Sequence, residues 1–292
     1  MFPDTQLSIC NNSDRLQFVN AWCQSLRRED RGRLKADLRI YDRIVTDDEN
    51  RVLFCDVPKA GSTVFKNLWL NFTRDVSIGN YVHIPRVLYK YNLRYLNSYT
   101  KSEIQTRLKT YFKFMIARHP FVRILSAYRS KFEVPNNLFE KIAGKYIKMR
   151  YSPANKPKDY RITFEEFVHY LVDKNLAEYN SHWKPITYLC HPCDINYDYI
   201  VKLETSYVDY PHVLSTLKNL SDSKRGALES MRMYKVNTSK DRIQTYYSRI
   251  PVKHMNSLEE IYHLDFDLFG YTWNKSTLTP GCQISAEDKN CC

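Results

Sequence analysis

Two short segments each stand where an apolar run typical of a buried strand gives way to a helical pattern. The first, residues 57–63, is VPKAGST, and the second, residues 118–126, is RHPFVRILS. α/β proteins hold phosphates at such turns, because the free N–H groups and positive dipole end of a helix N-terminus favour an anion. Each turn also carries hydroxyls and a cation, Lys59 or Arg118. The pair predicts an α/β fold and a ligand with phosphate-like groups at two separate places.

The periodicity of the chain supports this fold class. Short apolar runs predict strands at residues 51–57, 112–117 and 199–203. Helical patterns cover residues 13–28, 102–109, 163–173 and 257–262, with capping pairs expected at Ser102 and Gln105 and at Thr163 and Glu166. After the first turn, Val64, Leu68 and Phe72 are spaced as the apolar face of a helix. Strands alternating with helices predict a central, mainly parallel sheet flanked by helices in three layers.

No internal repeat or linker divides the chain. We expect a helical and charged N-terminal extension over residues 1–50, one domain over residues 51–273, and a cysteine-containing tail over residues 274–292. Residues 145–161 are basic and contain prolines, which predicts a long surface loop within that domain.

The charge of the chain is strongly positive. Its 44 Lys and Arg against 32 Asp and Glu give a net charge of +12, which suggests an anionic partner such as nucleic acid, a membrane surface or an acidic polysaccharide. A solvated basic surface is the alternative. The 23 tyrosines can stack on bases or on sugar rings, so their number does not distinguish a nucleic-acid partner from a carbohydrate partner.

Two features predict a secretory compartment. N-glycosylation sequons occur at Asn11, Asn71, Asn219, Asn237 and Asn274, and the chain has eight cysteines. No apolar run approaches the roughly 18 residues needed to span a bilayer, so we expect a lumenal domain whose membrane anchor is missing from this chain. The motif Cys190-His191-Pro192-Cys193 has two other interpretations. A zinc site would need two further ligands, and the chain has no second Cys-x-x-Cys. A thiol–disulfide exchange motif should open a helix directly after a strand, whereas this one lies in a proline-rich stretch. A structural disulfide, within the motif or to other cysteines, is favoured.

The first turn differs from an ATP-binding loop, whose lysine comes late, just before the hydroxyl residue. Here Lys59 comes first and Gly61, Ser62 and Thr63 follow, so the loop is suited to one terminal anion between Lys59 and the backbone N–H groups. The alternative is an ordinary capped turn. In the second turn, Arg118 and Ser126 can reach a single phosphate, since the planar fork of Arg donates two parallel hydrogen bonds. The alternative there is a salt bridge.

Together the two turns resemble a specific family. Residues 58–63 look like the 5′-phosphosulfate loop of sulfotransferases, and residues 118–132 look like the 3′-phosphate element of the Golgi carbohydrate sulfotransferases. The similar branch includes chondroitin and dermatan 4-O-sulfotransferases and the sulfotransferase acting on terminal glucuronyl glycans. The resemblance covers residues 53–273 and departs at Val64 and Phe65, where that branch has Asn and Trp.

The resemblance implies a P-loop-like fold, 3′-phosphoadenosine-5′-phosphosulfate (PAPS) as donor, no metal, and a sugar hydroxyl as acceptor. The acceptor would be an acidic glycosaminoglycan or proteoglycan in the Golgi lumen, with the chondroitin- or dermatan-like N-acetylgalactosamine 4-O position favoured. Lys59 would stabilise leaving-group charge and Arg118 and Ser126 would hold the 3′-phosphate. The full predicted cofactor set is Pro58, Lys59, Ala60, Gly61, Ser62, Thr63, Val64, Arg118, Arg123 and Ser126.

A sugar hydroxyl needs a base to take its proton. His83 is the first choice, because its position between the two turns is similar to that of the base in related glycosaminoglycan sulfotransferases. His182 is second, His119 is expected to shape its turn, and a structural role is the alternative for each base candidate. Two other functions remain open. A nucleotide-dependent kinase lacks the expected loop ending and a clear Mg²⁺-binding Asp after a strand, and a nucleic-acid-binding module lacks a recognisable reading motif.

Overall fold

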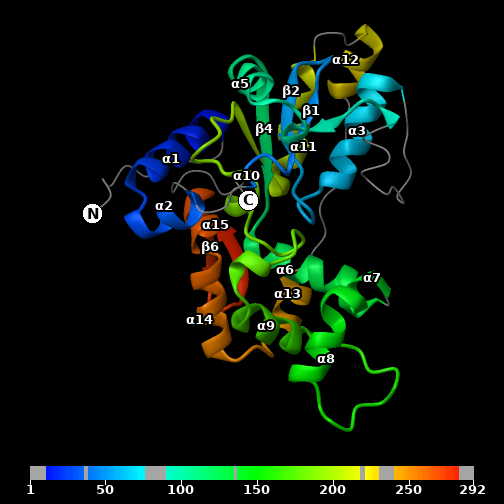
Figure 1. Cartoon of the computed structure of the whole chain (residues 1–292), viewed down its shortest axis with the longest axis vertical. Helices are drawn as coiled ribbons and strands as arrows, with labels where there is room; N and C mark the ends of the chain where they lie inside the picture. The colour runs from blue at the N-terminus through cyan, green and yellow to red at the C-terminus, as the bar shows by residue number, and fades with distance from the viewer. Residues whose placement is uncertain are drawn as a thin grey trace. The chain divides into compact units, whose positions relative to one another are not determined.

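The fold is described by a computed structural model, which covers residues 11–35, 39–75, 90–134, 137–217, 221–229 and 240–282. The chain divides into two units, and each unit is built from more than one segment of the chain (Figure 1). Unit 1 comprises residues 1–118, 186–236 and 283–292, and unit 2 comprises residues 119–185 and 237–282.

A five-stranded sheet forms the centre of unit 1, in the order β3-β1-β2-β4-β5. The strands are β1 Ile44–Asp47, β2 Val52–Cys55, β3 Arg94–Tyr95, β4 Phe112–Ala117 and β5 Tyr199–Lys202. β2, β4 and β5 run parallel, whereas β1 is antiparallel to both β2 and β3. The three strands expected from the sequence are therefore present, and they make the parallel half of the sheet.

The expectation of a mainly parallel sheet was wrong in its other half. β1 lies inside the charged stretch before residue 51, where no strand was predicted, although each of its residues is buried. It returns to β2 through the short turn at residues 48–51, and a turn of this length can join only antiparallel neighbours. The sheet is consequently mixed, with a hairpin on one side of β2 and parallel strands on the other.

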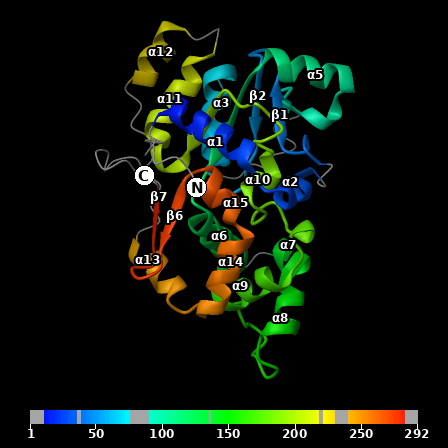
Figure 2. The same ribbon diagram turned by 90° about the vertical axis from the view of Figure 1, so that its left-hand side faces the viewer.

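Helices cover both faces of the sheet. Unit 1 contains α1 Asn12–Ser25, α2 Arg28–Lys35, α3 Ser62–Arg74, α5 Lys101–Thr110, α10 Ile186–Cys190, α11 Ser206–Ser215 and α12 Asp222–Glu229. Phe54 and Phe114 are paired in the register and pack on Phe65 of α3, at ring-centroid distances of 5.7 and 5.0 Å. α11 lies beside α3 on this face (Figure 2). Cys55 is the next residue along β2, so it points to the opposite face, where α10 lies.

α1 protects the free edge of the sheet. The Asn12 side chain accepts a hydrogen bond from the N–H of Ile200 and donates one to the carbonyl of Asp198, at 2.9 Å each. Arg15, which is 3% exposed, donates to the Ile200 carbonyl and pairs with Asp209 of α11. These side chains satisfy backbone groups of β5 that an edge strand would otherwise leave unpaired.

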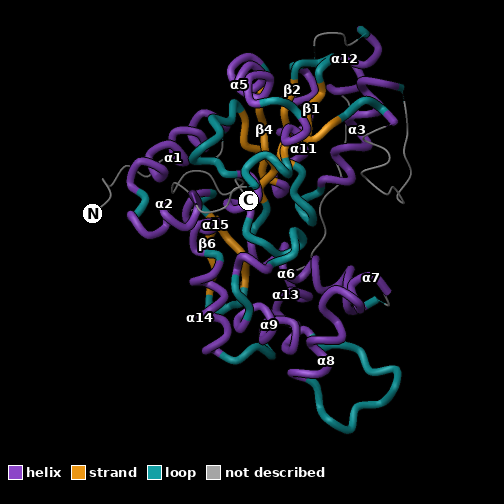
Figure 3. The backbone as a smooth tube through the Cα atoms, in the orientation of Figure 1, coloured by secondary structure: helices purple, strands orange, loops and turns teal. Residues whose placement is uncertain are grey.

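Unit 2 is mostly helical, as the colouring of Figure 3 shows. Its main elements are α6 Pro120–Tyr128, α7 Asn137–Phe139, α8 Lys145–Tyr151, α9 Phe164–Asp173, α13 Lys240–Tyr247, α14 Val252–Ile261, α15 His263–Leu268 and the antiparallel hairpin β6 Tyr271–Asn274 and β7 Thr279–Cys282. The fully buried Phe121 of α6 packs on Tyr247, Phe266 and Trp273, with ring centroids 5.0–5.3 Å apart. Aromatic packing thus holds α6 against the C-terminal helices and hairpin of unit 2. No helix in the described ranges is long and apolar enough to cross a bilayer.

Local helix predictions had mixed outcomes. The capping box of Thr163 and Glu166 is confirmed at the start of α9. The box of α5 is instead formed by Thr100 and Glu103, so the pair of Ser102 and Gln105 was wrong by two residues. Both choices satisfy the same sequence pattern, and the pattern alone cannot rank them.

The predicted apolar face of α3 was wrong at Val64, whereas Phe72 of the same face is buried and Leu68 is half-buried. Val64 is 42% exposed, whereas Phe65 and Trp69 are fully buried. Apolar residues occur on two adjacent faces of this helix, and the aromatic rings of the sheet select the one that carries Phe65 and Trp69. Residues 145–161 were expected to be a loop, but residues 145–151 form α8 and only the remainder lacks helix.

Candidate anion-binding site

The loop after β2 has an unusual backbone. Lys59 and Gly61 both have positive φ, at 68° and 77°. The N–H of Ala60 donates to the Val57 carbonyl at 3.3 Å, which closes the turn before α3 begins at Ser62. Gly61 is the N-cap residue of α3 and provides no side chain to cap the first-turn N–H groups. These groups are the donors that the sequence predicted for an anion.

Gly61 is required at its position for two reasons. Its left-handed conformation disfavours any residue with a Cβ. A Cβ built there would also lie 2.5 Å from Leu203 Cδ1 and 2.9 Å from the Tyr210 hydroxyl oxygen. The residues that follow β5 and those of α11 therefore approach the loop as closely as its backbone allows.

Arg118 joins the second predicted motif to the first. Its side chain is buried at the end of β4, and its Nη1 donates a 2.6 Å hydrogen bond to the carbonyl oxygen of Lys59. A lysine at positive φ is strained, by about 1–3 kcal/mol for such conformations in general. The hydrogen bond from Arg118 helps to hold the loop in this conformation, so the first residue of the second motif contacts the first motif within unit 1.

A buried charge cluster lies beneath the loop. Asp56 directly follows β2 and pairs with Lys66 of α3 at 2.5 Å and with Arg43 at 2.9 Å. Burial acts to raise the pKa of Asp56, but the cations Lys66 and Arg43 outweigh it and hold that pKa below its ordinary value. A hydrogen bond that the Ser62 side chain donates to Asp56 also lowers this pKa. Asp56 thus ties the first turns of α3 to the end of β2.

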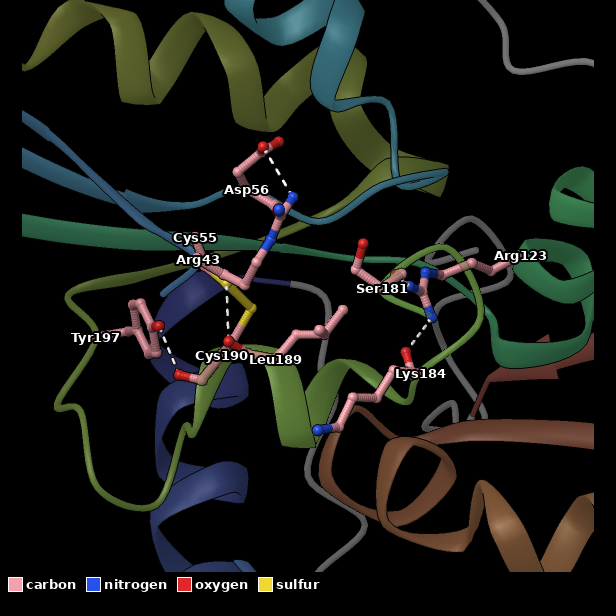
Figure 4. Close-up of a disulfide and its surroundings, with 9 residues drawn as sticks. All are labelled: Arg43, Cys55, Asp56, Arg123, Ser181, Lys184, Leu189, Cys190 and Tyr197. Carbon is pink, nitrogen blue, oxygen red and sulfur yellow. Dashed lines mark hydrogen bonds and ion pairs between the residues drawn. A yellow bond between two sulfur atoms is a disulfide. The ribbon is translucent and has the colours of Figure 1, made fainter. Parts of the chain in front are cut away.

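Two disulfides hold residues 190–193 to β2 and to α1. Cys55, the last residue of β2, is bonded to Cys190 (Figure 4). Cys23 of α1 is bonded to Cys193. The Tyr197 hydroxyl donates to the Cys190 carbonyl at 2.7 Å and supports the same turn. The prediction that the Cys-His-Pro-Cys motif forms structural disulfides is confirmed, and of its two alternatives the structure has the bonds to other cysteines.

The other predicted loop residues differ in exposure. Ala60 and Ser62 are buried, Pro58, Lys59 and Gly61 are half-buried, and Thr63 and Val64 are exposed. Ser126 lies within α6 of unit 2 and is half-buried.

Arg123 has a structural role in unit 2. Its side chain is 1% exposed and donates to the carbonyl oxygens of Lys184 and Ser181, at 2.7 and 2.8 Å (Figure 4). These bonds hold residues 181–184 against α6. Its predicted contact with the cofactor remains a prediction.

The histidines have distinct environments. His83 lies outside the described residues. Nδ1 of His182 lies 2.7 Å from Oδ1 of Asn180, so its Nδ1–H can donate there and leave Nε2 as a proton acceptor. His119 is buried, and its Nε2 lies 2.8 Å from the Thr272 carbonyl oxygen, in agreement with a role in shaping the chain.

Sequence reasoning missed three contributors to this site: Asp56, Lys66 and Tyr210. Asp56 was detectable as a carboxylate at the end of a predicted strand, and Lys66 as a cation in the following helix. Nothing in the local sequence marks Tyr210, because it reaches the loop from α11, far along the chain. Within the described ranges, no group of three or more His, Cys, Asp or Glu side chains is placed to hold a metal ion.

Unit 1 is a mixed α/β unit with a loop between β2 and α3 whose first-turn N–H groups have no side-chain cap. This arrangement is typical of proteins that hold phosphate-like groups at the start of a helix. The sequence matches the model of the sulfotransferase family over residues 42–272, and the chain belongs to that family. It is therefore a sulfotransferase enzyme.

Several relatives support the assignment. Carbohydrate sulfotransferase 11 of Mus musculus is 35% identical over 240 residues, which cover 78% of this chain and 67% of the relative. Carbohydrate sulfotransferase 14 of Danio rerio is 32% identical, covering 82% of this chain and 64% of the relative. Carbohydrate sulfotransferase 9 of Homo sapiens is 31% identical, covering 79% and 53%. No solved structure gives a significant match to this chain.

Proposed function

We propose that this protein is a carbohydrate O-sulfotransferase with a P-loop-like fold that moves the sulfuryl group of PAPS to a sugar hydroxyl of a glycan. The observation that carries the proposal is the 2.6 Å hydrogen bond from Arg118 to the Lys59 carbonyl. It joins Arg118, the first residue of the segment that resembles the 3′-phosphate element, to the loop that resembles the 5′-phosphosulfate loop. The names of the relatives, all carbohydrate sulfotransferases, support a glycan as the acceptor.

The chemistry is an in-line displacement at sulfur, which demands positioning and stabilisation of leaving-group charge. In our proposal, Lys59 contacts the 5′-phosphosulfate and stabilises charge that develops on the bridging oxygen. The backbone N–H groups of residues 61–64 and the hydroxyl of Thr63 hold the same group, whereas the Ser62 hydroxyl donates to Asp56. Arg118 and Ser126 hold the 3′-phosphate. Arg123 is assigned to support of residues 181–184 because both hydrogen bonds described above go to that segment.

A general base completes the proposed mechanism. His83 is the candidate from its position in the sequence, and His182 is the second. The hydrogen bond between His182 and Asn180 suits a base, because it orients the ring and presents Nε2 as acceptor. Loss of a general base lowers the rate by about 10²- to 10⁴-fold. Comparing His83→Ala with His182→Ala at saturating donor identifies which histidine has that effect.

We propose an acidic glycosaminoglycan or proteoglycan as the acceptor, with the N-acetylgalactosamine 4-O position of a chondroitin- or dermatan-like chain favoured. Residues 141–158 carry six cations and no carboxylate. Of these cations, Lys141, Lys145 and Arg150 have exposed side chains on or next to α8. A local excess of positive charge of this kind attracts a polyanion.

The Golgi lumen is the proposed compartment. The disulfides Cys55–Cys190 and Cys23–Cys193 are expected in an oxidising environment. The sequon residues Asn11, Asn71 and Asn274 are exposed, as glycan attachment requires. Peptide mapping of protein secreted from animal cells should recover both cross-links and glycans at these positions. Unmodified asparagines and reduced cysteines in that material would contradict the assignment.

Ligand binding separates this function from the alternatives. A ligand that binds the native state raises its melting temperature. We expect stabilisation by adenosine 3′,5′-bisphosphate, but not by ADP or by an oligonucleotide. Stabilisation by ADP would favour a kinase, and stabilisation by the oligonucleotide would favour a nucleic-acid-binding module. Incubation with labelled PAPS and a panel of desulfated glycans then identifies the acceptor.

A further inference from the structure

Tyr210 presents a buried hydroxyl group that lacks a partner. The residue lies in α11 and is 1% exposed, and its hydroxyl has no hydrogen-bond partner among the described residues. Buried tyrosine hydroxyls usually find a partner, and an unpaired one costs about 1–3 kcal/mol. A position that retains such a group needs an explanation beyond packing.

The hydroxyl lies at the start of α3. The Tyr210 ring packs on Phe65 of α3, with ring centroids 5.2 Å apart. Its oxygen would lie only 2.9 Å from a Cβ at Gly61, the N-cap residue of α3. The absence of a side chain at Gly61 therefore creates the space in which the hydroxyl sits, next to the first-turn N–H groups.

The electrostatic surroundings make this hydroxyl a hydrogen-bond donor. Burial, Asp209 and Glu204 raise the pKa of Tyr210 well above its ordinary value, while the nearby Arg118 acts in the opposite direction. The hydroxyl is consequently protonated at neutral pH. Together with the first-turn N–H groups of α3, it provides donors that fit the oxygens of an anion.

We propose that the Tyr210 hydroxyl donates a hydrogen bond to the anionic 5′ group of the nucleotide held at the start of α3, and so contributes to binding of both donor and product. This inference rests on the function proposed above and adds a residue of α11 to the nucleotide site. It also explains why the hydroxyl has no partner within the protein, because its partner arrives with the ligand.

The test is Tyr210→Phe, which keeps the ring on Phe65 and removes only the oxygen. Calorimetry should show affinity for adenosine 3′,5′-bisphosphate reduced about 10-fold or more, since a hydrogen bond to a charged group contributes on that scale. The melting temperature of the unliganded variant should equal or exceed that of the wild type, because an unpaired buried hydroxyl has been removed. A purely structural tyrosine would not combine these two effects.

Tyr197→Phe is the matched control. This buried tyrosine already donates to the Cys190 carbonyl, so its variant should melt at a lower temperature and bind the nucleotide as the wild type does. Equal nucleotide affinity for Tyr210→Phe and wild type would overturn the assignment of Tyr210 while leaving the proposed function intact. Failure of the wild type to bind adenosine 3′,5′-bisphosphate would instead overturn the proposed function and, with it, this inference.

Discussion

At the residue scale, Lys59 combines a strained backbone with a charged side chain. Its φ of 68° is maintained while its carbonyl accepts from Arg118, so the backbone role does not depend on the side chain. Lys59→Ala should therefore leave the melting temperature nearly unchanged and lower the rate of sulfate transfer by about 10²- to 10³-fold, as loss of a preorganised charge-stabilising donor does. A radiolabelled transfer assay measures this. Wild-type turnover by the variant would show that Lys59 has another role.

Asp56 predicts a pH effect on stability. Asp56→Asn removes the carboxylate from the buried Lys66 and should lower the free energy of unfolding by about 3–5 kcal/mol at pH 7. The folded-state pKa of Asp56 lies below the unfolded value of 3.8, so its stabilising contribution is present above that pH. The contribution is lost as the pH falls through the folded-state pKa.

Urea denaturation of wild type and Asp56→Asn, repeated from pH 7 down to pH 3, tests this. The difference between the two proteins should stay constant down to about pH 5 and shrink on further acidification. A difference that is independent of pH over the whole range would mean that Asp56 is not stabilised as a carboxylate in the fold.

At the element scale, the start of α3 depends on Gly61, which Leu203 and Tyr210 approach closely. Gly61→Ala places a Cβ at positive φ and 2.5 Å from Leu203 Cδ1, so it should destabilise the protein by about 1–3 kcal/mol and weaken nucleotide binding. Gly226→Ala in α12 is the matched control, because nothing lies within 4 Å of a Cβ there. That variant should gain up to about 1 kcal/mol, since alanine is the better helix former. Denaturant midpoints that shift in the same direction for both variants would contradict the role given to Gly61.

The elements also show where local sequence information is sufficient. The strands β2, β4 and β5 and the cap of α9 follow from apolar runs and a capping pair, which are local patterns. The strand β1 was missed because its residues lie in a charged stretch, and only pairing with β2 and β3 accounts for its burial. The buried face of α3 was misassigned at Val64 because its apolar residues occur on two adjacent faces, although Phe72 was placed correctly.

At the scale of the whole molecule, the net charge of +12 predicts a salt-sensitive encounter with a polyanionic acceptor. We expect kcat/KM for a glycosaminoglycan to fall about 10-fold or more as salt rises from low to well above physiological concentration, because the screening length falls to about 8 Å at physiological salt and about 3 Å at 1 M. Steady-state kinetics over a salt series measure the effect. A salt-independent kcat/KM would argue against a polyanionic acceptor.

The charge excess on residues 141–158 can be separated from the overall charge. The triple variant Lys141→Gln, Lys145→Gln and Arg150→Gln should lower kcat/KM and flatten its salt dependence. The charge-matched control is Lys101→Gln, Lys109→Gln and Lys253→Gln, which changes exposed lysines on other helices. Equal effects of the two triple variants would assign the attraction to net charge rather than to this segment.

The sequence by itself determined the two turns from strand to helix, the cation in each, and the family that they resemble. Apolar runs, turn residues and caps act over a few neighbouring residues, so their physics can be recognised in a short window. The tertiary structure alone decided that Arg118 bonds the Lys59 carbonyl, that Cys55 and Cys23 are the partners of Cys190 and Cys193, and that Tyr210 reaches Gly61. These contacts join segments far apart in the chain, and they arise from strand order and helix packing, which no local pattern specifies.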